Sequence, residues 1–136
     1  MAHDKFRAEI LTPEGEVFSD EVEMISTRTT AGSIGVLAHH APILAMLEPT
    51  ELRLYKTESE VVRYAQAEGY MQVAENRALL LVEEAHSPND LGGLNLRERL
   101  SQAERDLESA GEDTERRRVA ERDKRRLEEF LRISEG

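Results

Sequence analysis

The sequence predicts a β + α protein, in which an antiparallel β-sandwich over residues 1–86 precedes an antiparallel two-helix hairpin over residues 94–136. Short strand-like runs recur at spacings of roughly 8–12 residues up to residue 84, which is typical of an antiparallel sandwich or barrel. Residues 87–93 have the composition of a linker. Beyond them, apolar residues recur in steps of four and three, the spacing of a helix that packs against another helix.

The first strand is predicted by apolar residues that alternate with charged ones between Phe6 and Ile10, the period-2 pattern of a half-buried strand. Residues 12–15, Thr-Pro-Glu-Gly, then form a turn, because proline restricts φ and glycine admits positive φ. Two further short strands are expected at residues 17–18 and 22–26.

Four later apolar runs also read as strands. They are residues 52–55, 61–65, 70–73 and 78–82. The polar residues 57–60 between the first two runs indicate a hairpin. The last run is continuously apolar, which predicts a strand that is buried on both faces.

The helical hairpin is predicted from one apolar seam and two end signals. The seam is Leu96, Leu100, Ala103, Leu107 and Ala110. Gly111 follows directly, at a position where the C-terminus of a helix favours glycine. Asp113 or Thr114 can then cap a second helix. Two helices joined by such a short turn form an antiparallel pair.

One stretch, residues 31–47, is rich in small and apolar residues and is longer than a single strand. Part of it should lie at the surface as a loop. An apolar surface loop is a candidate for binding a partner. The alternative is a sheet edge that folds into the core, and the pattern alone favours neither.

Composition excludes several classes of function. The chain has 136 residues and a formal net charge of −10, so it is a poor general binder of nucleic acid or anionic lipid. It contains no cysteine, which excludes a disulfide framework, a thiolate zinc site and a cysteine nucleophile. There is no membrane-spanning apolar run and no apolar signal core near Met1, so the chain is expected to be soluble, without direct membrane insertion.

Motifs for catalysis and for metal or phosphate binding are also missing, so no enzyme is expected. Residues 32–35, Gly-Ser-Ile-Gly, lack the Lys-Ser/Thr that a phosphate-binding loop needs. His39 and His40 are adjacent, and adjacent side chains in an extended chain point to opposite faces, so they chelate a metal poorly.

The charge is unevenly distributed. Residues 1–84 contain 7 Lys+Arg and 15 Asp+Glu, a net charge of −8. Residues 116–126 contain seven basic and two acidic residues, a net charge of +5. This basic block has three interpretations: a solvated face paired to glutamates, a surface for an acidic protein, or a site for a nucleotide phosphate. The solvated face is the usual case for such a block. Pairs four residues apart do not neutralise its charge, so the other two interpretations stay open.

Three passages give the chain a family likeness. Residues 10–18, Ile-Leu-Thr-Pro-Glu-Gly-Glu-Val-Phe, contain a first strand and its turn. Residues 32–44 contain Gly-Ser-Ile-Gly and then His-Ala-Pro-Ile-Leu. Residues 68–81 contain Glu-Gly-Tyr-Met-Gln-Val, an asparagine and Leu-Leu-Leu. Together with Ala-Glu-Arg at 103–105 and the charged hairpin, they resemble the epsilon subunit of bacterial and chloroplast F-type ATP synthase over nearly the whole chain.

The resemblance implies a flattened β-sandwich that binds the gamma subunit, rests on the ring of c subunits and turns with the rotor. The subunit would link proton flow to ATP synthesis without performing chemistry itself. It would lie peripherally at the cytoplasmic face of a bacterial plasma membrane, or the stromal face of a thylakoid. The implied contacts with gamma or the c ring are Gly32, Ser33, Gly35, His40, Pro42 and Ile43.

For the helical hairpin, the resemblance implies a mobile regulatory element that can extend along gamma toward the alpha and beta subunits. Its basic second helix would then meet an acidic segment of beta and inhibit ATP hydrolysis. Opposite charge steers and orients such a contact. The implied inhibitory residues are Arg116, Arg118, Arg122, Arg125 and Arg126.

The sequence departs from the family pattern in two places. Ser33 stands where the family often has an acidic residue, which weakens a specific polar contact with the c ring, although His40 is retained. Some relatives bind ATP in the hairpin through Ile/Leu-Asp-x-x-Arg-Ala. Residues 91–96 and 94–99 each lack the complete Asp and Arg of that motif, so no cofactor and little ATP binding are expected.

Two other classes of function remain open from the residues alone. One is a β-domain with a coiled-coil arm that acts as an adaptor unrelated to ATP synthase. The other is a small nucleotide-binding regulator. The His-Ala-Pro passage separates these two classes from a rotor subunit, because only the rotor hypothesis gives that passage a contact with other rotor proteins.

Overall fold

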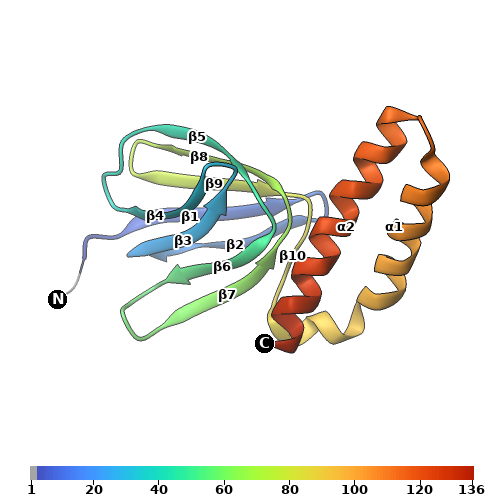
Figure 1. The fold of residues 1–136 in the computed structure, drawn as a ribbon. Helices are drawn as coiled ribbons and strands as arrows, with labels where there is room; N and C mark the ends of the chain where they lie inside the picture. Colours follow the sequence, from blue (N-terminus) through green and yellow to red (C-terminus); the bar gives the residue numbers. More distant parts are fainter. Residues whose placement is uncertain (1–2) are drawn as a thin grey trace. The chain divides into compact units, whose positions relative to one another are not determined.

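The computed structural model describes residues 3–136, and the chain divides into two compact units between Ser87 and Pro88. The first unit contains the strands and the second the helices (Figure 1). The strands are β1 (Phe6–Thr12), β2 (Gly15–Val22), β3 (Met24–Thr29), β4 (Gly32–Leu37), β5 (Ile43–Leu47), β6 (Thr50–Tyr55), β7 (Val61–Gln66), β8 (Gly69–Ala74), β9 (Arg77–Val82) and β10 (Ala85–His86). The helices are the 3-10 helix η1 (Pro88–Gly93), α1 (Leu96–Ala110) and α2 (Thr114–Glu135).

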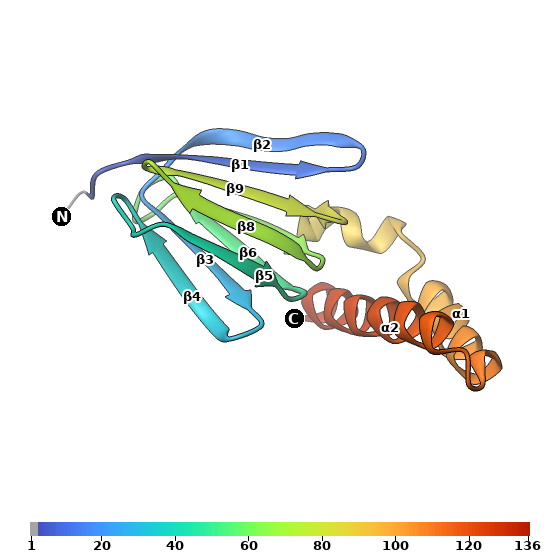
Figure 2. The same ribbon diagram turned by 90° about the horizontal axis from the view of Figure 1, so that it is seen from above.

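The strands form one hydrogen-bonded path in the order β10-β7-β6-β3-β5-β8-β9-β1-β2, with β4 paired to β3 (Figure 2). The path folds over so that inward residues of β1, β8 and β9 share one core with those of β3 and β6. Within the described residues every pairing is antiparallel apart from β1 with β9. The predicted fold class, a β-sandwich followed by a helical hairpin, is confirmed.

The core of the sandwich is mainly aliphatic. In β1 the predicted alternation is present, since Phe6, Ala8 and Ile10 are buried while Arg7 and Glu9 are half-exposed. Each fully buried aliphatic side chain of this kind contributes about 1.5–3 kcal/mol relative to an exposed one. The other large core residues include Ile25, Leu52, Leu54, Met71 and Leu80.

Two details differ from the sequence prediction, and a third agrees with it. The expected strand at 22–26 is interrupted, because Glu23 lies between β2 and β3 and donates its backbone N–H to the carbonyl of Tyr55 at 2.7 Å. The expected linker 87–93 is largely the helix η1, whose Leu91 is buried and which packs against α2. Residues 31–47 form two strands joined by a short connection at 38–42, so part of this stretch is a surface loop, as expected.

The prediction that 78–82 is buried on both faces is wrong. In β9 the side chains of Ala78, Leu80 and Val82 are buried, but Leu79 is half-buried and Leu81 is exposed. The reason is that the described strands cover this layer on its inner side only, so alternate residues of β9 face outward. A continuous apolar run therefore marks an uncovered sheet face here.

The helical unit follows the predicted end signals. Asp113 is the N-cap of α2, and its side chain accepts the N–H of Arg116 at 3.1 Å. Gly111 ends α1 at φ 56, a left-handed value that glycine adopts without strain. Helices α1 and α2 pack together, with small residues such as Ala103 and Ala120 on their buried faces.

A buried glutamine links three parts of the sandwich. Gln66 is 0% exposed at the end of β7. Its Oε1 accepts the Thr27 hydroxyl at 2.7 Å, and its Nε2 donates to the carbonyl of Glu48 at 2.8 Å. Because both the oxygen and the nitrogen of the side-chain amide form hydrogen bonds, its burial carries no desolvation penalty from a missing hydrogen bond.

Gln66→Ala is expected to lower the free energy of unfolding by about 2–3 kcal/mol, because it creates a cavity and leaves the Thr27 hydroxyl and the Glu48 carbonyl without this partner. Urea denaturation of the full chain would measure the change. The matched control is Gln72→Ala at an exposed position of β8, with an expected change of about 0.5 kcal/mol or less. Equal effects of the two substitutions would contradict this role of Gln66.

Candidate partner-binding surfaces

A row of large apolar side chains crosses the outer face of β5, β8, β9 and β1. Met46 lies opposite Tyr70, Tyr70 opposite Leu81, and Leu81 opposite Leu11 in the strand registers. Leu44 adds to the row from the same face of β5, two residues before Met46. We call these five residues the apolar strip.

The apolar strip is unusually exposed for its residue types. The exposed fractions are 75% for Leu44, 54% for Met46, 52% for Tyr70 and 46% for Leu81. Isolated exposed apolar residues are ordinary, but neighbouring ones on one sheet face mark an interaction site. Tyrosine and methionine are also enriched in the centres of protein interfaces. The strip is therefore the surface of the sandwich best suited to bind another protein.

A shallow groove of about 330 Å³ adjoins the apolar strip. It is lined by Glu9, Leu11, Gln72, Ala74, Arg77, Ala78 and Leu79. Its polar edge includes an ion pair, with Arg77 Nη2 3.2 Å from Glu9 Oε1. An apolar floor with a polar rim suits a protruding side chain of a partner protein better than a charged small molecule.

The His-Ala-Pro connection between β4 and β5 is fixed by the turn between β8 and β9. Glu75 and Asn76 have φ values of 51 and 60, as in the two-residue turns that join tight hairpins. Asn76 Oδ1 accepts the N–H of His39 at 2.8 Å, and Asn76 Nδ2 donates to the carbonyl of Lys5 at 3.4 Å. One asparagine thus serves as a turn residue and as a clamp on residues 38–42.

Asn76→Ala should release this connection, because it removes both hydrogen bonds of the clamp. It also leaves alanine in a left-handed conformation, which costs about 1–2 kcal/mol for a residue without a side-chain amide. The amide of His39 should then exchange with solvent about tenfold faster, as measured by hydrogen exchange. Asn76→Gly is the matched control, since it keeps the turn and removes only the clamp. If His39 exchanges at the native rate in both variants, the clamp does not exist in solution.

The sequence-predicted contact residues of the sandwich occupy different environments. Gly32 (φ 122) turns the β3–β4 hairpin, where the Thr29 hydroxyl donates to its carbonyl at 3.1 Å. Ser33, Gly35 and Pro42 are exposed, and His40 is partly exposed. Ile43 is partly buried and packs against the core.

Sequence reasoning missed the apolar strip itself. Its signal is present in the alternation of β8 and β9: Tyr70 and Leu81 fall on the face opposite to Met71 and Leu80, so both faces carry large apolar residues. A polar outer face would have been expected for a sheet that water covers on one side.

The arginines of the basic block do not form one face. Arg118, Arg122 and Arg125 follow one another at steps of four and three residues, which places them on the same side of α2. Arg116 lies outside that row. Arg126 is only 6% exposed, and its Nη2 lies 3.5 Å from Asp123 Oδ1, so it does not belong to an exposed basic surface.

Acidic neighbours on α2 pair with much of this basic block. Arg118 donates to both carboxylate oxygens of Glu115, at 3.1 and 2.6 Å. The hydrogen bonds to Arg118, followed by its positive charge, lower the pKa of Glu115 below its usual value. The same hydrogen bonds, followed by the negative charge of Glu115, raise the pKa of Arg118. Arg122 pairs with Asp123 at 3.2 Å, and Arg117 pairs with Glu121 at 3.5 Å. The basic block therefore presents less positive charge at its surface than its net charge suggests.

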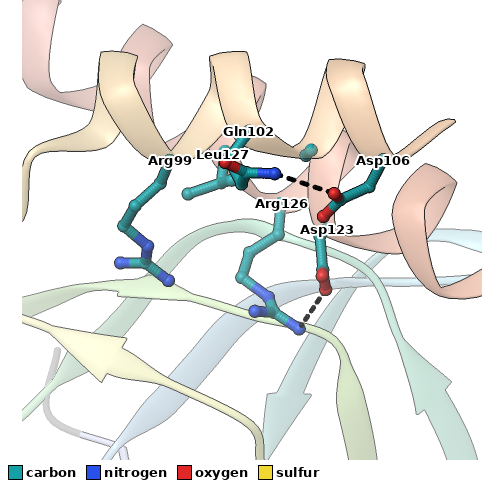
Figure 3. Close-up of a pocket in the computed structure, with 7 residues that line it drawn as sticks. Arg99, Gln102, Asp106, Asp123, Arg126 and Leu127 are labelled. Atoms are coloured by element: carbon teal, nitrogen blue, oxygen red, sulfur yellow. Dashed lines mark hydrogen bonds and ion pairs between the residues drawn. The ribbon is translucent and has the colours of Figure 1, made fainter. Parts of the chain in front are cut away.

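A small hollow of about 210 Å³ lies between α1 and α2 (Figure 3). Its lining is Arg99, Gln102, Ala103, Asp106, Asp123, Arg126 and Leu127. Figure 3 shows Gln102 bonded to Asp106, at 2.8 Å, and Arg126 paired with Asp123. The negative charges of the two aspartates balance the positive charges of the two arginines. The volume of the hollow is below the roughly 300–1,000 Å³ that is usual for small-molecule sites.

Among the described residues, no helix is both long and apolar enough to cross a bilayer. Among the same residues, no group of three or more potential metal-ligating side chains lies together.

Comparison with known proteins identifies relatives of the chain. Residues 5–88 match the family model described as "ATP synthase, Delta/Epsilon chain, beta-sandwich domain". The chain is 31% identical to the ATP synthase epsilon chain of Rubrobacter xylanophilus, with 92% of this chain and 88% of the relative aligned. It is 35% identical to the ATP synthase epsilon chain of Herpetosiphon aurantiacus, covering 82% and 83% of the two chains.

The fold is also found in a larger assembly. A chain in the structure of the Euglena gracilis mitochondrial ATP synthase, described as OSCP/F1/c-ring, matches with a TM-score of 0.75 and 20% identity, covering 94% of this chain and 80% of that chain. At this identity the likeness concerns the fold alone. The family match extends over most of the sandwich, and the epsilon-chain relatives extend into the hairpin. The chain belongs to the epsilon-subunit family of F-type ATP synthase.

Proposed function

We propose that this protein is a non-catalytic rotor subunit of a proton-translocating ATP synthase, located in the central stalk between the gamma subunit and the c ring. The observation that carries the proposal is the apolar strip, together with membership of the epsilon family. A sheet face with Leu44, Met46, Tyr70 and Leu81 exposed requires a protein partner to cover it. In an ATP synthase, the gamma subunit is the partner proposed for that face.

The His-Ala-Pro connection and the β3–β4 hairpin would supply the remaining rotor contacts. Ser33 and Gly35 are exposed on β4, and His40 lies in the connection from β4 to β5. The clamp of Asn76 on His39 holds this region in a single conformation, which lowers the entropy lost when a partner binds. The protein would be peripheral at the cytoplasmic or stromal membrane face, attached through its partners.

The helical hairpin is proposed to restrain ATP hydrolysis through the row Arg118, Arg122 and Arg125, in which the first and third are exposed and Arg122 is partly exposed. These side chains lie on one side of α2, and they would meet an acidic segment of a catalytic subunit when the hairpin extends. Arg118 and Arg122 must exchange Glu115 and Asp123, their carboxylate partners on α2, for those of the other subunit, which makes the contact weak enough to be reversible.

The regulatory proposal predicts that the double variant Arg118→Glu with Arg125→Glu raises ATP hydrolysis by the assembled enzyme. Reversing two exposed charges should weaken the blocking contact by about tenfold, since each exposed pair contributes roughly up to 1 kcal/mol. The assay is steady-state ATP hydrolysis at low salt, with Arg105→Glu on α1 as the matched control. Hydrolysis equal to that of the control would mean that this row does not inhibit.

We also propose that the hairpin does not hold ATP. Asp106 and Asp123 face the same hollow as Arg99 and Arg126 and balance their charges, so no net positive charge remains there to attract a polyphosphate. Isothermal titration of the full chain with ATP tests this proposal, and a micromolar dissociation constant would overturn it.

A further inference from the structure

The groove beside the apolar strip lies on the same sheet face as the strip. In the strand registers Gln72 lies opposite Leu79, and Leu79 lies opposite Glu9. Each of these three residues is two positions from the strip residue of its own strand, and residues two apart on a strand share one face of the sheet. Leu11 belongs both to the strip and to the lining of the groove. The groove is therefore a continuation of the strip over β8, β9 and β1.

The groove is hollow where a small side chain stands among longer ones. Ala74 ends β8 and lies opposite Arg77, with Gln72 two residues earlier on the same face. The described residues leave a volume of about 330 Å³ unfilled beside it. Ala74 and Leu79 are partly buried, so both line the apolar floor of the groove. A side chain from another protein would find apolar contacts there.

The charges around the groove cancel each other. Arg77 Nη2 lies 3.2 Å from Glu9 Oε1 at the rim. The neighbouring charges on this face, Arg7 and Glu21, lie opposite each other in the register of β1 and β2. A charged side chain would lose hydration over the apolar floor and find no unpaired opposite charge in return. The groove therefore favours an uncharged occupant.

A partner that lies on the strip also reaches the groove. Neighbouring residues on one face of a strand are about 7 Å apart, because each residue advances the strand by roughly 3.3 Å. A helix with its side chains is about 10–12 Å across. A helix that packs on Tyr70 and Leu81 can therefore place side chains over Gln72 and Leu79. The protein that covers the strip is the protein positioned to fill the groove.

We propose that the groove receives one large uncharged apolar side chain of the gamma subunit, either an aromatic residue, a leucine or a methionine. The inference rests on the proposed rotor function, which assigns the strip to gamma. A large side chain that fills a hollow of the partner is often one of the few residues that dominate an interface. Ala74 is then a specificity-determining residue, because its small size keeps the hollow open.

Filling the groove from within tests the proposal. Ala74→Leu adds apolar atoms on the outer face, since the core-facing residue at this end of β8 is Val73. We expect it to weaken binding to purified gamma subunit at least about tenfold in titration calorimetry, because the occupant is displaced. Arg63→Leu is the matched control, with the same side chain introduced at an exposed position of β7, and should bind within about twofold of the native chain.

The outcomes separate the groove from the rotor function. If Ala74→Leu binds gamma within about twofold of the control, or more tightly, while Tyr70→Glu binds weakly, the groove proposal is overturned and the strip remains the interface. If the native chain does not bind gamma, the rotor function and the groove proposal fail together.

A double-mutant cycle identifies the occupant. Each large apolar residue of gamma is replaced by alanine and titrated against the native chain and against Ala74→Leu. At the occupying position, the alanine substitution should weaken binding to the native chain at least about tenfold but change binding to Ala74→Leu by about threefold or less. Independent effects at every position of gamma would contradict occupation of the groove.

Salt dependence tests the chemical class of the occupant. The ratio of the affinities of the native chain and Ala74→Leu should stay within about twofold between roughly 0.1 M and 1 M ionic strength, because an uncharged contact is not screened. A ratio that falls toward one at high salt would indicate a charged occupant and would overturn the proposal.

Magnetisation transfer in the native chain provides a readout that needs no variant. With the methyl groups of Ala74 and Leu79 labelled, nuclear Overhauser effects to protons of gamma are expected in the complex. Their absence from a complex that shows such effects at Met46 would overturn the proposal, also if Ala74→Leu does not fold. Contacts between differently labelled copies of the chain, formed without gamma, would assign the groove to a second copy and overturn it as well.

Discussion

Replacing Tyr70 by glutamate is expected to weaken binding to the gamma subunit by at least about 100-fold while the sandwich stays folded. Tyr70 lies in the middle of the apolar strip, between Met46 and Leu81, and is half exposed in the unbound chain. A central aromatic residue often dominates the energy of an interface. The glutamate would in addition place an unpaired charge in the contact, at a large desolvation cost.

The measurement is titration calorimetry of the full chain with purified gamma subunit. Arg63→Glu is the matched control, because it introduces the same side chain at an exposed position of β7, away from the strip. Circular dichroism of both variants checks the fold. If Tyr70→Glu binds within about threefold of the control, the apolar strip is not the gamma interface.

Gly69, the residue before Tyr70, is a position where a single added methyl group should have a large effect on stability. Gly69→Ala is expected to lower the free energy of unfolding of the sandwich by more than about 3 kcal/mol. A β-carbon at Gly69 would lie 2.0 Å from the carbonyl oxygen of Leu81 and 2.7 Å from the α-carbon of Val82. Both atoms belong to the backbone of β9, so the clash can be relieved only by separating β8 from β9.

Gly35→Ala provides the comparison for this prediction. At Gly35 the nearest atom to an added β-carbon is Met24 Sδ at 3.9 Å, which is ordinary contact. Its unfolding free energy should change by about 1 kcal/mol or less. Urea denaturation of both variants measures the difference, and similar midpoints for the two would contradict the close approach of β8 and β9.

The division into a sandwich and a hairpin could be read from the sequence, because the apolar period changes from two to that of a helix around residue 90. The end signals of the hairpin were also local: Asp113 caps α2 with its own side chain, and Gly111 adopts a left-handed φ. Features of this kind depend on a few neighbouring residues, so a single sequence contains them.

The binding surface was harder to predict because it depends on tertiary structure. An apolar run such as 78–82 looks the same whether its second face is covered by the chain itself or by a partner. Only the exposed fractions of Tyr70 and Leu81 separate the two cases.

The basic block was overestimated for a related reason. Sequence reasoning counted partners four residues apart, whereas Arg118 pairs with Glu115 three residues earlier and Arg122 with the adjacent Asp123. A long, flexible arginine side chain can reach acidic residues one, three or four positions away along the helix. Which of them it pairs with depends on its rotamer, and the sequence does not show the rotamer.

The central claim, that the apolar strip faces gamma within the ATP synthase, is most directly tested by cross-linking in the assembled enzyme. The chain has no cysteine, so Met46→Cys provides a single attachment site for a photo-activated cross-linker. Mass spectrometry should identify gamma as the main product from position 46, and Arg63→Cys should yield much less of it. A product at position 46 that contains no ATP synthase subunit, or equal gamma products from both positions, would contradict the account.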